Sequence, residues 1–137
     1  MKFFIAIFLC TILLFGCKTN EDIIPNVSFS GQIYIPTISG NPTIVKYDLN
    51  QKRLGVNGVV IYRVAPDEYY AFDLMCPNEK SFDCFVKILD GATCQCPCCK
   101  TMYLIVTDPG SVVEGPSKWP LKSYQTYISG DYLTIYN

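Results

Sequence analysis

The sequence of 137 residues contains no histidine. Histidine is the commonest metal ligand and the commonest general base, so a metal site or acid–base chemistry would have to use other side chains. The formal net charge is only -1, which gives no electrostatic reason to expect a nucleic-acid partner. The chain also lacks a glycine-rich phosphate loop and any nucleophile beside a credible base, so we do not expect a catalytic site.

A helical pattern is missing as well, because no window of ten or more residues repeats its apolar positions with a helical period. Short runs rich in Val, Ile, Thr, Tyr and Phe are instead separated by glycine, proline and Asn-Gly turns, which is typical of strands. The clearest hairpin is at the C-terminus, around a Gly130-Asp131 turn. Strands are expected at 28–36, 44–49, 59–64, 69–74, 124–129 and 132–137. We therefore predict one all-β, mostly antiparallel domain over residues 27–137.

The first segment has the pattern of an export signal. Lys2 precedes an apolar run from Phe3 to Phe15, which is shorter than the roughly 20 residues that span a bilayer. Its end, Leu14-Phe15-Gly16-Cys17, resembles a bacterial lipobox. We expect residues 1–16 to be a lipoprotein signal peptide, Cys17 to be lipidated, and residues 17–26 to tether the domain to the membrane. An ordinary secretory signal or a short anchor helix are the alternatives.

Such a protein would face the oxidising periplasm or cell surface of the bacterial envelope, where free thiols persist chiefly when a metal holds them. Apart from Cys10 and Cys17, six of the eight cysteines remain: Cys76, Cys84, Cys94, Cys96, Cys98 and Cys99. Four of them lie within residues 94–99, and another begins Cys76-Pro77-Asn78 upstream. Two cysteine-bearing loops are typical of a metal site built from paired loops, although the same spacing could hold disulfides.

The arrangement resembles a Rieske iron–sulfur domain. That family has a Cys-Pro-x-His-Gly loop, an aromatic residue soon after it and a downstream Gly-Pro loop, which compare with residues 96–103 and Gly115-Pro116. The first Rieske loop, Cys-x-His, compares with residues 72–78. The resemblance covers about residues 44–137. It implies a Rieske-like antiparallel β-sandwich with two Cys-bearing loops at one tip.

The resemblance also implies a ligand set. In a Rieske centre two cysteines bind one iron and two histidines bind the other. Cys76 and Cys96 occupy the cysteine positions, Asn78 and Cys99 occupy the histidine positions, and Lys100 replaces the following glycine. A conventional His2Cys2 cluster is therefore not expected, since asparagine is a poor iron ligand and cysteine is a good one that would lower the potential.

Further positions of the family pattern are retained. High-potential members have a hydroxyl and a tyrosine that donate hydrogen bonds to the cluster sulfurs, and these compare with Thr101 and Tyr103. Tyr103 could equally be a core aromatic. These members also have a disulfide between the two loops. Cys98 occupies one of its positions, with Cys84 as the nearest partner and Cys94 as a further candidate.

Two functions follow from the resemblance. The first is electron transfer with an unidentified redox partner, using an iron–sulfur cluster or a single Fe or Zn ion on Cys76, Cys96, Cys99 and a fourth ligand from Cys84, Cys94 or Asn78. The second is a degenerate Rieske fold without a cluster, which disulfides stabilise and which serves as a binding or structural module. Rieske domains that assist oxygenases lie beside a separate catalytic domain, so at most we expect an electron-transfer component.

Both functions make the same geometric prediction. The two loops should meet at one tip, where the Cys76 and Cys96 sulfurs should lie roughly 4–7 Å apart with Cys99 close by, or be bonded if they are paired. The Gly115-Pro116 loop should pack alongside.

Overall fold

The structure is a computed structural model and describes residues 23–137. The predicted signal peptide and the predicted lipidation site, Cys17, lie outside the described residues. Within residues 23–137 the chain forms antiparallel β-strands and one short 3₁₀ turn, η1 (Ile35–Thr37), which confirms the all-β prediction. No helix in this part of the chain is long and apolar enough to cross a membrane.

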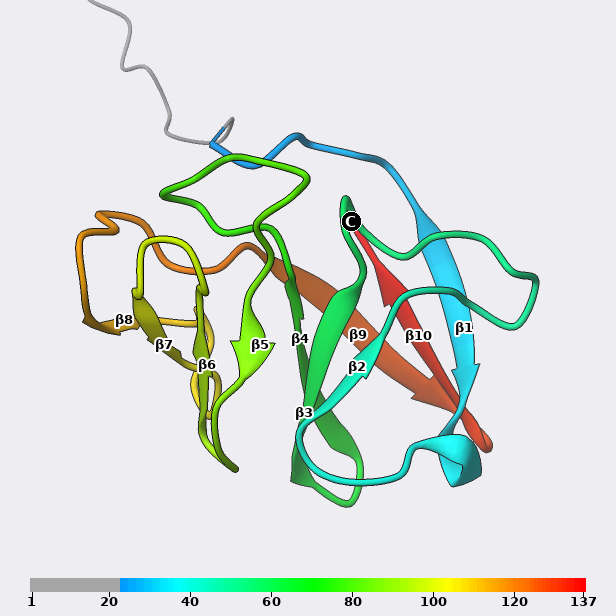
Figure 1. Ribbon diagram of the computed structural model, residues 1–137. Helices are drawn as coiled ribbons and strands as arrows, with labels where there is room; N and C mark the ends of the chain where they lie inside the picture. The colour runs from blue at the N-terminus through cyan, green and yellow to red at the C-terminus, as the bar shows by residue number, and fades with distance from the viewer. Residues whose placement is uncertain (1–22) are drawn as a thin grey trace, which may run out of the picture.

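The larger sheet has six strands, which form a curled sheet in Figure 1. The side chains inside the curl form an apolar core. In spatial order the strands are β1 (Ser30–Tyr34), β10 (Tyr132–Tyr136), β9 (Ser123–Ser129), β4 (Glu68–Asp73), β3 (Val59–Ala65) and β2 (Thr43–Val45). The predicted C-terminal hairpin is confirmed, because Ser129 pairs with Tyr132 across the Gly130-Asp131 turn. Gly130 has a φ of +59°, as a tight turn of this kind requires.

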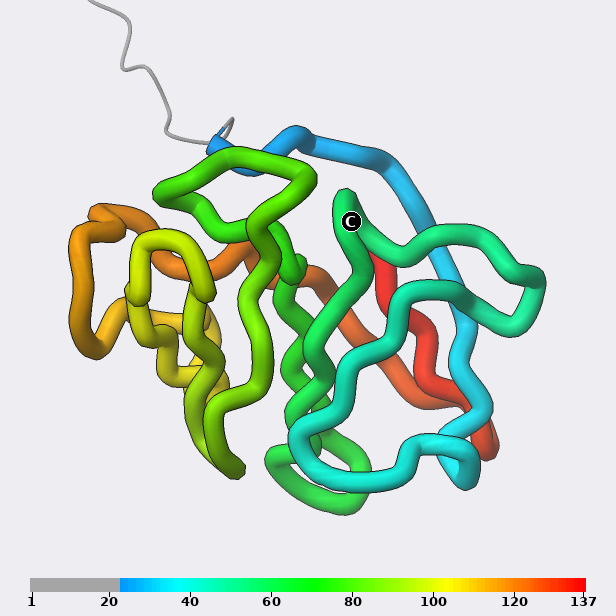
Figure 2. The backbone as a smooth tube through the Cα atoms, in the orientation of Figure 1, coloured from blue at the N-terminus to red at the C-terminus, as the bar shows by residue number. Residues whose placement is uncertain are grey.

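The smaller sheet carries the second cysteine loop. Its strands, in order, are β5 (Lys87–Ile88), β6 (Thr93–Gln95), β7 (Met102–Leu104) and β8 (Val112–Glu114), all antiparallel to their neighbours. Figures 1 and 2 show this sheet beside the larger one. Because β6 and β7 pair with each other, the segment between them, residues 96–101, forms the tip of a hairpin.

The central strands are buried on both faces. Val59 and Ile61 of β3 point into the core inside the curled sheet, whereas Val60 points into a second core that residues of both sheets form. Side chains alternate between the two faces of a strand, so an unbroken apolar run is expected where both faces are covered. The second core also contains the side chains of Cys76, Cys84, Cys94 and Cys96. These four cysteines are therefore held in a buried core rather than by exposed loops alone.

The end of the predicted tether packs on the domain. Ile24 is buried with Val56 and Met75, the residue before Cys76. Asn26 accepts a hydrogen bond from the Asn137 amide at 2.6 Å. These contacts hold the start of the domain beside the first cysteine loop.

Candidate metal centre

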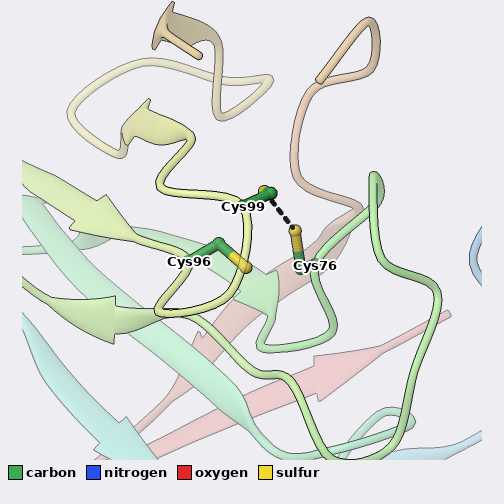
Figure 3. Close-up of side chains that lie close together, drawn as sticks. All are labelled: Cys76, Cys96 and Cys99. Atoms are coloured by element: carbon green, nitrogen blue, oxygen red, sulfur yellow. Dashed lines mark hydrogen bonds between the residues drawn. The ribbon is translucent and has the colours of Figure 1, made fainter. Parts of the chain in front are cut away.

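Three cysteine sulfurs converge between the two loops. Cys76 follows β4, and Cys96 and Cys99 lie between β6 and β7. Their sulfurs all lie within 4.8 Å of one another, and the Cys76 and Cys99 sulfurs are 3.6 Å apart. Figure 3 shows Cys76 approaching from one loop, and Cys96 and Cys99 from the other. The structure thus brings together three of the predicted ligands at the expected spacing.

The two loops have the same local conformation. Residues 76–80 and 96–100 both read Cys-Pro-x-x-Lys. In each, the lysine N–H donates to the cysteine carbonyl four residues earlier, at 2.9 Å for Lys80 and 3.0 Å for Lys100. Both lysines have a positive φ, 51° and 63°, which closes the turn in the way a helix C-terminus often ends. This repeated motif is the sequence signal from which the shared loop conformation could have been predicted.

The Cys96 sulfur is enclosed by its own loop. Cys96 is fully buried, and the backbone N–H groups of Cys99 and Cys98 act to lower the pKa of its thiol. Burial nevertheless dominates and raises the pKa of Cys96 to about 12, so without a metal this thiol stays protonated. A bound metal reverses that preference, because a coordinating thiol is deprotonated outright. The N–H groups are already in place to stabilise the resulting thiolate.

Cys99 interacts with a buried hydroxyl. Its thiol donates to the Thr101 hydroxyl at 3.1 Å, and the Ser117 N–H donates to the same oxygen at 3.2 Å. Burial raises the pKa of Cys99, but hydrogen bonds with Thr101 and with the neighbouring cysteines outweigh it, so the pKa falls below its usual value. Cys99 is therefore more easily ionised than Cys94 and Cys96, whose thiol pKa values are raised. Ser117, which helps to hold Thr101, was missed by the sequence analysis.

Tyr103 contacts the third sulfur. The residue is fully buried, and its hydroxyl lies 3.4 Å from the Cys76 sulfur, within hydrogen-bond distance for sulfur. Burial and the bond to Cys76 raise the pKa of the Tyr103 phenol. The phenol therefore keeps its proton and can donate it in a hydrogen bond to an ionised Cys76.

A disulfide joins the two loops. It links Cys84 to Cys98, with the two Cα atoms 6.2 Å apart, and so confirms the predicted pairing. The other candidate, Cys94, is a free thiol on β6 opposite Tyr103. Burial, together with the charge of Asp90, raises the pKa of Cys94 to about 12.

Asn78, the remaining predicted ligand, is exposed. Its side-chain amide donates to the Glu79 carboxylate at 3.5 Å. Its side chain therefore forms a hydrogen bond at the surface and not with the buried sulfurs.

A third loop covers the site. Gly115 has a φ of +107°, and a Cβ added there would lie 2.5 Å from the Cα of Thr101. Only glycine fits this approach, since a side chain would meet backbone rather than a movable group. The Gly115-Pro116 loop thus packs against the second cysteine loop, as predicted.

Three clustered sulfur donors suit soft or borderline metals such as zinc, iron and copper(I). A conventional Rieske cluster does not fit, because it needs two imidazoles and the chain contains no histidine.

In comparisons with known proteins, the chain matches no protein-family model and no curated protein. The function of the site is therefore inferred from its own residues.

Proposed function

We propose that this chain is a cysteine-ligated metal or iron–sulfur protein that transfers electrons in the bacterial cell envelope. Cys76, Cys96 and Cys99 hold the metal. The convergence of their three free sulfurs within 4.8 Å is the observation that carries the proposal. In an oxidising compartment, thiols so close together pair with one another unless a metal holds them.

The groups around the sulfurs support a metal centre. Thr101 and Tyr103 place hydroxyls at Cys99 and Cys76, and backbone N–H groups face Cys96. Hydrogen bonds to ligand sulfurs orient them and help to set the potential of iron–sulfur sites. Packing in an apolar core does not require polar groups beside three cysteine sulfurs, so these contacts favour a metal centre.

We further propose that the domain is a divergent Rieske-type domain. Both cysteine loops, the disulfide between them and the covering Gly115-Pro116 loop occur in the family's order. Lys100 adopts a positive φ where the family has glycine. The departure is in the ligands, since Asn78 and Cys99 stand at the histidine positions.

A bound iron centre would supply one-electron transfer at a potential lower than that of a histidine-ligated Rieske centre. The remaining roles belong to residues of the chain itself. Cys76, Cys96 and Cys99 bind the metal, the hydroxyls of Thr101 and Tyr103 stabilise thiolate charge, and the Cys84–Cys98 bond holds the loops together.

The lipobox-like sequence supports anchoring through Cys17, with an unidentified envelope redox protein as partner. Ile24, the end of the tether, packs against Met75 beside the first ligand loop.

The second candidate is a metal-free module that disulfides stabilise. Two observations favour it: the Cys84–Cys98 bond is formed, and the Cys76 and Cys99 sulfurs are 3.6 Å apart. A bond between the latter pair would need only a small shift and would add about 2–4 kcal/mol of stability.

Cobalt(II) titration of the metal-free protein separates the two candidates. Thiolate-to-cobalt charge-transfer absorption should appear in the wild type and be lost in Cys76→Ser, Cys96→Ser and Cys99→Ser. Cys94→Ser is the matched control, because this buried free thiol lies outside the cluster of three, and the variant should bind like the wild type. Absence of the band in the wild type, or its persistence in all three ligand variants, would contradict the metal centre.

A further inference from the structure

Cys96 belongs to two groups of sulfurs at once. Its sulfur lies within 4.8 Å of those of Cys76 and Cys99, and also within 4.8 Å of those of Cys84 and Cys98. Cys96 is a free thiol, whereas Cys84 and Cys98 are bonded to each other. A thiol beside a disulfide is the arrangement that thiol–disulfide exchange requires.

We propose that Cys96 exchanges with the Cys84–Cys98 disulfide and thereby moves the free thiol from the buried Cys96 to the exposed Cys98. The Cys96 sulfur loses its proton and bonds to the Cys84 sulfur. The Cys84–Cys98 bond breaks, and Cys98 leaves as a thiolate that takes up a proton. One disulfide and one thiol are present before and after, so the step needs neither oxidant nor reductant. The role of Cys96 as a metal ligand in this scheme rests on the proposed function.

The burial of the three cysteines sets the direction of attack. Cys84 is 4% exposed and Cys96 is fully buried, whereas Cys98 is exposed. A leaving thiolate is better solvated at the surface than in an apolar interior, so Cys98 is the better leaving group. The new Cys84–Cys96 bond joins the same two loops, so the crosslink that stabilises the fold is kept.

The exchange controls the metal site. A sulfur bound to a metal is not free to attack, so a loaded site keeps the disulfide at Cys84–Cys98. After exchange, only Cys76 and Cys99 of the three ligands remain. Loss of the metal therefore permits the exchange, which is slow because the buried Cys96 thiol is mostly protonated and only its thiolate attacks. Exchange in turn prevents reloading and presents an exposed free thiol at Cys98.

Differential alkylation of the mature protein tests this. Zinc-loaded protein is treated anaerobically with a chelator and sampled over hours, the timescale of uncatalysed disulfide rearrangement. Each sample is denatured in acid with N-ethylmaleimide, reduced, treated with iodoacetamide and digested with trypsin. Fragmentation of the peptide of residues 88–100 then shows whether maleimide is on Cys96 or Cys98. Cys96→Ser removes the attacking thiol, and Cys94→Ser removes a thiol of the same peptide that is not beside the disulfide.

We expect maleimide to be lost from Cys96 and gained equally by Cys98 in the wild type and in Cys94→Ser. Cys96→Ser and protein kept in zinc should show no maleimide on Cys98. Label that stays on Cys96 in the metal-free wild type, or that reaches Cys98 in Cys96→Ser, would overturn the proposal. Zinc content is measured in the same samples. A chain that binds no zinc refutes the proposed function, while its alkylation pattern still decides the exchange.

Discussion

Replacement of Gly115 by alanine should damage both the stability of the fold and the candidate site. The added Cβ would lie 2.5 Å from the Thr101 Cα and 2.8 Å from its Oγ1. A residue with a Cβ at positive φ costs about 1–2 kcal/mol. Forcing a group into a packed interior costs about 1–3 kcal/mol more, so we expect Gly115→Ala to lower the free energy of unfolding by about 2–5 kcal/mol.

Gly130→Ala is the matched control. Gly130 also has a positive φ, +59°, but a Cβ there would meet nothing within 4 Å. Chemical denaturation with the disulfide intact should therefore show only the backbone cost of about 1–2 kcal/mol for this variant. Because Thr101 binds Cys99, Gly115→Ala should also weaken cobalt binding by about 10-fold or more, whereas Gly130→Ala should not. Equal destabilisation of the two variants, or unchanged cobalt affinity in Gly115→Ala, would refute this reasoning.

Three further predictions concern the cysteines and their neighbours. Tyr103→Phe removes the hydroxyl that lies 3.4 Å from the Cys76 sulfur. We expect the free energy of unfolding to fall by about 1 kcal/mol and voltammetry to show a lower reduction potential for a bound iron centre. An unchanged potential would argue against the contact. Replacing both Cys84 and Cys98 by serine removes a disulfide between cysteines 14 residues apart. Denaturation should show a free energy of unfolding that is lower by about 3 kcal/mol. An unchanged free energy would mean that this disulfide does not stabilise the fold. The pKa of about 12 for Cys94 lies above the ordinary 9.0, so above pH 9 the unfolded thiol ionises while the folded one keeps its proton. Cys94 alone should therefore lower the free energy of unfolding by about 1.4 kcal/mol per pH unit between pH 9 and 12, and denaturation of Cys94→Ala should show a slope that is smaller by about this amount.

Local sequence predicted the larger sheet well. Strands β3, β4, β9 and β10 coincide with runs of β-branched and aromatic residues, and glycine marks the turn between β9 and β10. The smaller sheet was not predicted, because β5 to β8 have only two or three residues each. Such strands are too short to show alternation, and they form because neighbouring strands and the second core hold them.

The candidate site could be predicted only in part. The resemblance to a Rieske domain implied that Cys76, Cys96 and Cys99 would meet and that Cys98 would pair with Cys84 or Cys94, and the structure shows the Cys84–Cys98 bond. The contact of Ser117 with Thr101 could not be foreseen, because a separate loop brings its N–H there from 16 residues away. The position of Cys96 beside the disulfide likewise depends on how the two loops pack together.

The central claim is that Cys76, Cys96 and Cys99 hold a metal. Metal and acid-labile sulfide analysis of mature protein, purified anaerobically from its native envelope, tests this most directly when it is combined with a thiol count after metal removal. We predict bound metal, sulfide in addition if the centre is an iron–sulfur cluster, and four free thiols, at Cys76, Cys94, Cys99 and either Cys96 or, after exchange, Cys98. Protein that contains no metal, and in which Cys76 and Cys99 are already joined in a disulfide, would contradict the account.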